Sequence, residues 1–243
     1  MAIVALAVAG LVSGVLNVLA GGGSFLTLPL LLFLGLPAAE ANGTNRVGVV
    51  IQGLGAVWGF HRHRVMNWRW AFGVSVPALV GAALGTWAAL VIPDLAFRRV
   101  LSVAMLAITL WTIAAPAPTP RTVLRSAWSP GVVIGFFLVG LYGGFLQAGV
   151  GFLVLAVTSF AGLDLVRGNA VKVLSVLALT VLSLSIFASN GVIHWGYGLA
   201  LGAGNFAGAL IGVRLSVLRG HRWLQRFVTV TVIIFAILLW VTD

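Results

Sequence analysis

The chain has 243 residues, of which 61% are hydrophobic and only 7% charged, with 14 basic against 4 acidic side chains and a net charge of +10. A soluble domain carries about 25% charged and about 45–50% apolar residues, so this composition excludes a soluble globular protein. Its high hydrophobicity also excludes a disordered chain. Thirteen of the fourteen basic residues are Arg, and the lack of Cys excludes disulfides and thiolate metal sites.

A membrane-spanning helix needs roughly 20 mostly apolar residues. The chain contains eight apolar stretches that can be compared with this length. They cover residues 2–34, 43–60, 70–92, 96–115, 130–161, 173–189, 196–218 and 223–241. The first and fifth are too long for one crossing. The first contains the glycine run 21–23 followed by Ser24 and Pro29, and the fifth contains glycines at 143–144, 149 and 151. Because glycine runs and proline break helices, we expect two broken or re-entrant hairpins.

The two halves of the chain are similar in sequence. A shift of 127 residues superposes the two halves without a gap, and identical residues then coincide at many positions. Among these pairs are Phe25 and Phe152, Asn42 and Asn169, Trp68 and Trp195, and Gly85 and Gly212. We therefore expect two membrane repeats, residues 1–115 and 128–243, joined by a Pro-rich linker at 116–127. The N-terminal run belongs to the first repeat and has no basic leader, so we do not expect a removable signal peptide.

The positions of the arginines predict how the repeats are oriented, because cytoplasmic loops of membrane proteins carry an excess of Lys and Arg. If each repeat crosses the membrane an odd number of times, nine arginines share one side and three lie on the other. The nine are Arg62, Arg64, Arg69, Arg121, Arg125, Arg167, Arg219, Arg222 and Arg226. An even number of crossings gives no such bias. We therefore predict an all-α polytopic membrane protein with two inverted-topology repeats, each a broken hairpin plus three transmembrane helices, and both chain ends outside the cytoplasm.

The broken hairpins are the strongest local feature for function. A half-helix that begins in mid-membrane points free N–H groups and a partial positive charge at its N-terminus, which favours an anion. The alternative is close helix packing through small residues, which is what we expect of Gly81 and Gly85. We assign the anion-binding role to the backbone at Gly22, Gly23, Ser24, Gly149 and Gly151.

A polar run follows each hairpin, at positions that are costly in lipid unless the side chains are paired or face a cavity. We expect these residues to orient a substrate, together with Gln147 inside the second hairpin; they are Asn42, Thr44, Asn45, Arg46, Asn169 and Lys172. Helix capping is the alternative for the Asn and Thr side chains. Snorkelling to the membrane surface is the alternative for the two cations. Among other intramembrane polar residues, Asn17 ranks behind Gln147, and Gln52 and Asn205 are expected to bond between helices.

No enzyme motif is present: there is no nucleophile elbow, no HExxH and no phosphate-binding loop of the GxxxxGK type. The four acids, Glu40, Asp94, Asp164 and Asp243, lie near the ends of apolar stretches. They form no buried carboxylate pair to relay protons or hold a cation. The His-Arg-His-Arg run at 61–64 fits a basic loop beside lipid headgroups better than a metal site. We therefore expect no enzyme, metal or cofactor, and an anionic ligand.

The sequence resembles the TauE/SafE family over essentially its whole length. The resemblance is carried by the glycine-rich break with Ser24 and Pro29, by Gly35-Leu36-Pro37, and by Ala41-Asn42-Gly43-Thr44. It implies a bacterial or archaeal inner-membrane transporter of small sulfur oxyanions, such as sulfite, sulfoacetate or related sulfonates. Thr44-Asn45 fits the family pattern, whereas the second copy has Val171-Lys172 at the equivalent positions.

The sequence thus predicts a secondary transporter of a small anion that works by alternating access at the repeat interface. An anion channel and a non-transporting structural subunit remain as alternatives. The expected partners are the small anionic substrate and membrane lipid, without nucleic acid. The oligomeric state stays open, a homo-oligomer included.

Overall fold

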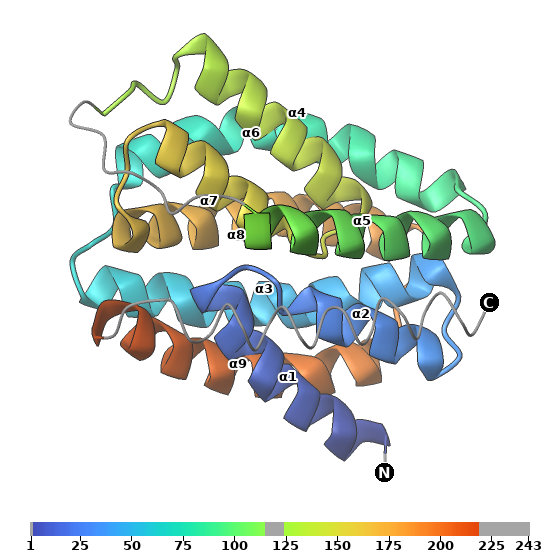
Figure 1. Cartoon of the computed structure of the whole chain (residues 1–243). Helices are drawn as coiled ribbons and strands as arrows, with labels where there is room; N and C mark the ends of the chain where they lie inside the picture. The colour runs from blue at the N-terminus through green and yellow to red at the C-terminus, as the bar shows by residue number, and fades with distance from the viewer. Residues whose placement is uncertain (1, 115–123, 219–243) are drawn as a thin grey trace.

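The computed structural model describes residues 2–114 and 124–218, and over these ranges the chain is helical and contains no strand (Figure 1). This agrees with the predicted all-α class. The helices are α1 (Ala2–Leu19), α2 (Ser24–Phe33), α3 (Ala38–Arg62), α4 (Trp68–Val91), α5 (Asp94–Ala114), α6 (Pro130–Phe145), α7 (Val150–Phe160), α8 (Leu165–Ser189) and α9 (Trp195–Leu218). The last predicted apolar stretch, 223–241, lies outside the described residues.

Helix boundaries recur along the chain at the spacing of the sequence repeat. Helices α8 and α9 begin and end 127 residues after α3 and α4, respectively. The polar run predicted to open the third helix lies within α3, which begins at Ala38, and its copy lies within α8. These Asn and Thr side chains therefore sit inside their helices and are not N-caps of them.

The corresponding helices α3 and α8 lie next to each other at the centre and run in opposite directions (Figure 1). Gly43 near the start of α3 faces Phe187 near the end of α8, whereas Gly53 faces Leu177. Both helices have 25 residues, a length of about 37 Å. This length suffices to cross the hydrocarbon core of a bilayer.

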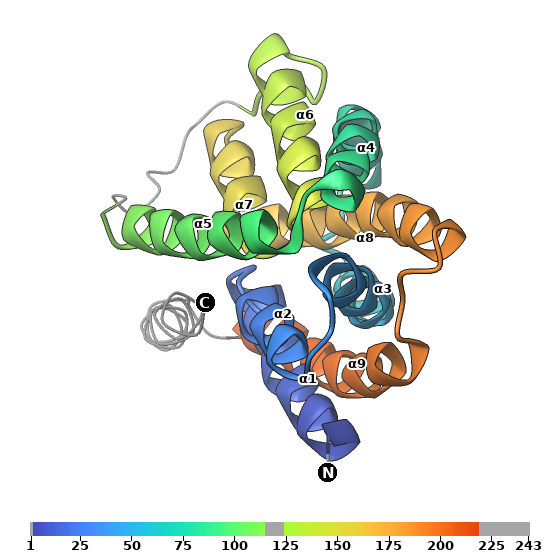
Figure 2. The same ribbon diagram turned by 90° about the vertical axis from the view of Figure 1, so that its right-hand side faces the viewer.

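The remaining helices form two bundles, each of which contains one helix from the other half of the chain (Figure 2). The first bundle consists of α1, α2, α3 and α9, and the second consists of α6, α7, α8 and α4. Helix α5 lies across both bundles, with Phe97 packed on Phe145 at a ring-centroid distance of 5.8 Å. The exchange of α4 and α9 ties the two halves of the chain together.

Small residues allow the exchanged helices to approach closely. On α4, a Cβ at Gly81 or Gly85 would collide with the carbonyl oxygens of Phe137 or Leu141 on α6. Gly204 and Gly208 on α9 face backbone carbonyls of α1 in the same way. The expected packing role of Gly81 and Gly85 is therefore confirmed.

Each predicted hairpin is a pair of helices with a short break between them. The glycines at 143–144 were expected to contribute to the second break, and this is wrong, because both lie within α6. Helix α1 ends at Leu19 and α2 begins at Ser24, while α6 ends at Phe145 and α7 begins at Val150. Proline was expected to contribute to the first break, and this is wrong: α2 continues through Pro29. A proline removes one backbone hydrogen bond and kinks a helix, whereas the glycines at 21–23 supply the turn.

The tips of the two hairpins meet in the middle of the molecule. A Cβ on Gly21 would collide with the backbone of Gly151, and a Cβ on Gly151 would collide with that of Gly21. Next to this contact the rings of Phe25 and Phe152, which are equivalent in the repeat, stack with centroids 6.5 Å apart. The main chains of both breaks therefore touch without a side chain between them.

The loops gather at two opposite ends of the structure. At one end, the N–H of Arg125 donates to Ala161 O and its carbonyl accepts from Trp70 Nε1, which joins the starts of α4 and α6 to the end of α7. At the other end, Asp94 accepts from Ala38 N, and Thr44 accepts from His194 N. Five of the nine arginines that we expect in the cytoplasm lie in the described residues, and the first end carries them. They are Arg62, Arg64, Arg69, Arg125 and Arg167.

The outer surface is apolar, as a lipid-facing surface must be. On α4, exposed residues recur every three to four positions and include Phe72, Val76, Val80 and Leu84. Within residues 2–114 and 124–218, four helices are long and apolar enough to cross a membrane, namely α1, α4, α8 and α9. Helix α3 carries more polar residues than these four helices, and its polar side chains near the start are buried at the centre of the molecule, away from lipid.

Candidate functional site

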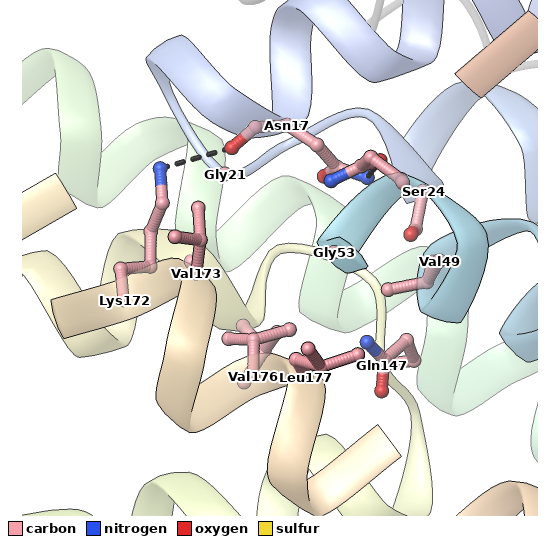
Figure 3. Close-up of a pocket in the computed structure, with 13 residues that line it drawn as sticks. Asn17, Gly21, Ser24, Val49, Gly53, Gln147, Lys172, Val173, Val176 and Leu177 are labelled. Atoms are coloured by element: carbon pink, nitrogen blue, oxygen red, sulfur yellow. Dashed lines mark hydrogen bonds between the residues drawn. The ribbon is translucent and has the colours of Figure 1, made fainter. Parts of the chain in front are cut away.

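A pocket lies where the hairpin tips meet α3 and α8 (Figure 3). The cavity is small, about 20 Å³, which is room for roughly one water molecule. Its polar lining comes from both halves of the chain. The lining residues are Asn17, Gly21, Ser24, Val49, Gln52, Gly53, Gln147, Val150, Gly151, Lys172, Val173, Val176 and Leu177.

Lys172 brings a cation to the wall of this pocket. It is the eighth residue of α8, about 12 Å along the helix from its start, and it is 2% exposed. Its Nζ donates to the carbonyl oxygen of Asn17 at 2.9 Å (Figure 3). It also donates to Val18 O at 2.8 Å and to Asn169 Oδ1 at 2.7 Å. The two carbonyls belong to the last turn of α1, where the helix dipole favours a positive charge.

Arg46 plays the corresponding role at the other hairpin, but behind the pocket wall. It is the ninth residue of α3 and is fully buried. Its Nη2 donates to Gly144 O in the last turn of α6, and its Nη1 donates to Gln147 Oε1 at 2.9 Å. The guanidinium also lies 5.0 Å from the centroid of the Phe187 ring. Arg46 therefore reaches the pocket through Gln147.

The two cations cross between the halves of the chain. Arg46 from the first half holds the end of α6, and Lys172 from the second half holds the end of α1. Within residues 2–114 and 124–218, neither cation has a carboxylate within ion-pair distance, and none of the acids is buried. A buried charge without a counter-charge is costly. The centre of the molecule therefore favours an anion.

Three amide side chains add polar groups to the pocket. Asn17 accepts from Gly23 N at 2.8 Å and donates to Gln52 Oε1 at 2.9 Å. Gln147 occupies the turn before α7 with a φ of 62° and donates to Thr180 Oγ1 at 3.1 Å. A positive φ is uncommon for a residue other than glycine, and such strain often marks a functional position.

Two backbone N–H groups complete the polar half of the pocket. Ser24 is the first residue of α2, and Gly151 is the second residue of α7. Neither N–H has a hydrogen-bond partner among the described residues. The opposite wall consists of aliphatic side chains from α3, α7 and α8, namely Val49, Val150, Val173, Val176 and Leu177. The pocket therefore combines a cation and N–H groups with a short apolar surface.

The structure brings only some of the predicted site residues to the pocket. Ser24, Gln147, Gly151 and Lys172 line it. Asn169 and Arg46 do not line the pocket but are hydrogen-bonded to residues that do. Asn169 is bonded to Lys172, and Arg46 is bonded to Gln147. The snorkelling alternative for the two cations is wrong, because both are buried inside the protein and bonded there. Gly22, Gly23 and Gly149 lie at the hairpin tips and do not line the pocket, although Gly23 N holds Asn17.

The remaining predicted residues hold helices together. Asn42 Nδ2 donates to Phe145 O at 2.7 Å, so it caps the end of α6. Thr44 accepts from His194 N at 2.8 Å, and Asn45 accepts from Thr27 Oγ1 at 2.6 Å. None of the three lines the pocket.

The pocket also contains two polar residues that were left outside the predicted site, Asn17 and Gln52. Gln52 bonds between helices as expected, and it faces the pocket as well. Its context could have indicated this, because an amide within the apolar stretch 43–60 is costly in lipid unless it is paired or faces a cavity. Asn17 precedes the glycine run by one helical turn in an apolar context, which is a comparable signal.

Comparisons with known proteins identify the family of the chain. The sequence model of the family described as "Sulfite exporter TauE/SafE" matches residues 6–239 of the chain. The chain belongs to the TauE/SafE family. Broken helices that meet near the bilayer midplane are a feature of many secondary transporters, in which they form the binding site.

Several proteins named as probable membrane transporters are similar to this chain over most of their length. A "Probable membrane transporter protein" of Haemophilus influenzae is 30% identical over 224 residues, which cover 91% of this chain and 88% of that protein. "Probable membrane transporter protein ORF9" of a Sinorhizobium species is 26% identical, with 95% and 89% covered. YfcA of Escherichia coli K12, also named a probable membrane transporter protein, is 26% identical, with 90% and 82% covered. The chain is thus a membrane transporter of this family and an integral membrane protein.

Proposed function

We propose that this TauE/SafE protein is a secondary transporter of a small sulfur oxyanion, such as sulfite, sulfoacetate or a related sulfonate. The observation that carries the proposal is the pair of buried cations, Lys172 and Arg46, without a buried carboxylate in the described residues. A transported anion supplies the missing negative charge. In a conformation that widens the cavity, the apolar wall formed by Val49, Val173 and Val176 would suit a short organic substituent on such an anion.

Alternating access follows from two inverted-topology repeats. The antiparallel course of α3 and α8, the recurrence of helix bounds at 127 residues and the meeting of the hairpin tips support this topology. Exchange of conformation between the halves would open the pocket to each side in turn. The small size of the cavity, about 20 Å³, supports a carrier more than a channel, because a channel needs a continuous pore.

The bacterial or archaeal inner membrane is the proposed location, with the arginine-rich end of the protein in the cytoplasm. This orientation rests on the positive-inside rule and on the gathering of Arg62, Arg69 and Arg125 at one end. Labelling of single cysteines introduced at Arg69 and at His194 would test it, because the chain has no Cys of its own. Only the cysteine at position 194 should react with an impermeant reagent applied from outside.

The transport proposal is tested with purified protein in proteoliposomes. We expect saturable uptake of labelled sulfite or sulfoacetate down an imposed gradient, and no single-channel current. Flux that does not saturate would favour the anion channel. A folded protein that moves no sulfite and no sulfonate in either direction would overturn the proposal and favour a structural subunit.

A further inference from the structure

We propose that the polar groups whose orientation the protein fixes present only hydrogen-bond donors to the ligand, and that the pocket therefore selects an oxyanion whose charged group carries no proton. This inference rests on the proposed function and narrows its substrate class. A carboxamide can donate or accept, so the selectivity depends on which end of each amide faces the cavity. In this pocket the protein fixes the orientation of all three amides.

The orientation of Asn17 and Gln52 is set by a chain of contacts that begins at the hairpin tip. The backbone N–H of Gly23 can only donate, so the Asn17 atom 2.8 Å away must be its oxygen. The amide nitrogen of Asn17 then faces Gln52 at 2.9 Å, and the Gln52 atom that accepts must be Oε1. The NH2 group of Gln52 is left for the pocket.

The NH2 group of Gln52 is open to a ligand. Among the described residues, it has no hydrogen-bond partner. Its nitrogen is also not enclosed by protein. By contrast, Asn42 Oδ1 and Asn45 Nδ2 are fully buried and have no hydrogen-bond partner among the described residues. Gln52 therefore offers N–H donors to the cavity that it lines.

Gln147 is oriented by Arg46 in the same manner. A guanidinium has no acceptor, so the Gln147 atom 2.9 Å from Arg46 Nη1 must be Oε1. The NH2 group donates one hydrogen to Thr180 Oγ1 at 3.1 Å and keeps the second. Arg46 is thus a positioning residue, which turns a donor of Gln147 toward the pocket.

The other polar groups of the pocket add donors as well. Lys172 has no acceptor, and it occupies the carbonyl oxygens of Asn17 and Val18 that would otherwise face the cavity. The N–H groups of Ser24 and Gly151 have no partner in the described part of the chain. The hydroxyl of Ser24 is not fixed in this way: it can donate to an anion, and its oxygen can also accept a hydrogen bond.

A ligand with an O–H on its charged group would have the rotatable Ser24 hydroxyl as its acceptor, and would then lose the hydrogen bond that Ser24 donates to an unprotonated anion. The loss of a hydrogen bond to a charged group costs about 1.5–3 kcal/mol. A binding site built from oriented hydrogen-bonding groups therefore binds a ligand much more weakly when the ligand's own hydrogen-bonding groups do not match. A sulfonate carries no proton, whereas a phosphonate monoanion of the same shape and charge carries one.

The test uses methanesulfonate and methylphosphonate, which are nearly isosteric. Binding of each to the purified full-length protein is measured by calorimetry at a mildly acidic pH, at which methylphosphonate is a monoanion. We expect methanesulfonate to bind at least about tenfold more tightly. Equal affinities would overturn the inference and leave the anion transporter standing. A folded protein that binds neither probe, sulfite nor sulfoacetate would overturn both proposals.

Two variants test the amides directly. Gln52→Glu and Gln147→Glu keep the oxygens that accept from Asn17 and Arg46 but place an acceptor where the NH2 group faced the cavity. The added charge weakens both probes, so the measured quantity is the ratio of their affinities. We expect this ratio to fall by about tenfold in either variant, because the carboxylate accepts the O–H of methylphosphonate.

The matched control is Asn67→Asp, which also converts an amide to an acid. Asn67 caps α4 by accepting from Trp70 N at 3.2 Å, and this contact survives the change. It lies at the arginine-rich end, away from the pocket, so its ratio should equal that of the unmodified protein. If both pocket variants fold and keep the unmodified ratio, the donor-only pocket is excluded. If one variant does not fold, the other decides by the same criterion.

Discussion

The two hairpins end in similar ways but differ in how their cations meet the pocket. Lys172 holds the last carbonyls of α1 and lines the cavity itself. Arg46 holds the last turn of α6 and touches the cavity only through Gln147. One hairpin therefore has a charge in reach of a ligand, and the other has a neutral amide in front of its charge.

The chemistry of the two side chains suits this difference. An ammonium on a flexible stem can exchange one of its three oxygen partners for a ligand oxygen without moving the backbone. A guanidinium is planar and rigid, so it holds Gly144 O and Gln147 Oε1 in a fixed relation. We infer that Lys172 serves ligand binding first, and that Arg46 serves the structure of the second hairpin first.

Replacement of the lysine should have the largest effect on binding. Lys172→Met removes the ammonium and leaves the α1 carbonyls without a donor. Loss of a buried charge contact costs about 4 kcal/mol, so we expect anion affinity to fall about a thousandfold, measured by calorimetry with methanesulfonate. Arg214→Met is the control, because Arg214 is exposed on α9 and its loss should leave affinity unchanged. Affinity retained in a folded Lys172→Met protein would remove the distinction between the two cations.

A change at the contact between the tips should affect both hairpins together. Gly21 has a φ of 88° and no space for a Cβ against Gly151. Backbone strain and overpacking together should cost Gly21→Ala about 3 kcal/mol of unfolding free energy, and transport should be lost. The measurements are thermal unfolding in detergent and uptake in proteoliposomes.

Gly35→Ala separates strain from contact. Gly35 has a similar φ of 89°, but nothing lies within 4 Å of its missing Cβ. We expect it to lose only about 1–2 kcal/mol, with transport retained. Equal losses in the two variants would mean that the tip contact contributes nothing.

Replacement of the arginine should lower stability more than affinity. Arg46→Met leaves Gly144 O and Gln147 Oε1 without donors but also removes an unpaired buried charge. We expect a net loss of about 2 kcal/mol, seen as a fall of several degrees in Tm. Affinity for methanesulfonate should fall by about tenfold, because Gln147 is free to turn its oxygen toward the ligand. A loss of affinity as large as that of Lys172→Met would show that both cations contact the anion.

The sequence predicts the helices of this fold well and the partners of its polar residues poorly, for a physical reason. Helix positions follow from local patterns, since apolar runs and glycine breaks act within a few tens of residues, and the repeat presents these patterns twice. Lys172 and Asn17 are 155 residues apart, and Arg46 and Gln147 are 101 apart. Their contacts depend on the exchange of helices between the halves, which no local pattern encodes. Asn42 thus has a recognisable polar position, while its partner, Phe145 O, follows only from the packed structure.

The smallest expected effect concerns a predicted site residue that lies away from both cations. Thr44 Oγ1 accepts from His194 N at the entrance to α9, at the opposite end from the described arginine-rich loops. Thr44→Val keeps the shape of the side chain and removes this acceptor, so unfolding free energy should fall by about 1 kcal/mol. Affinity for methanesulfonate and the maximal rate of uptake should not change, because Thr44 does not line the pocket. A fall in affinity without a fall in stability would place Thr44 in the binding site. It would also mean that, at the first hairpin, α3 contributes to ligand binding as well as Lys172.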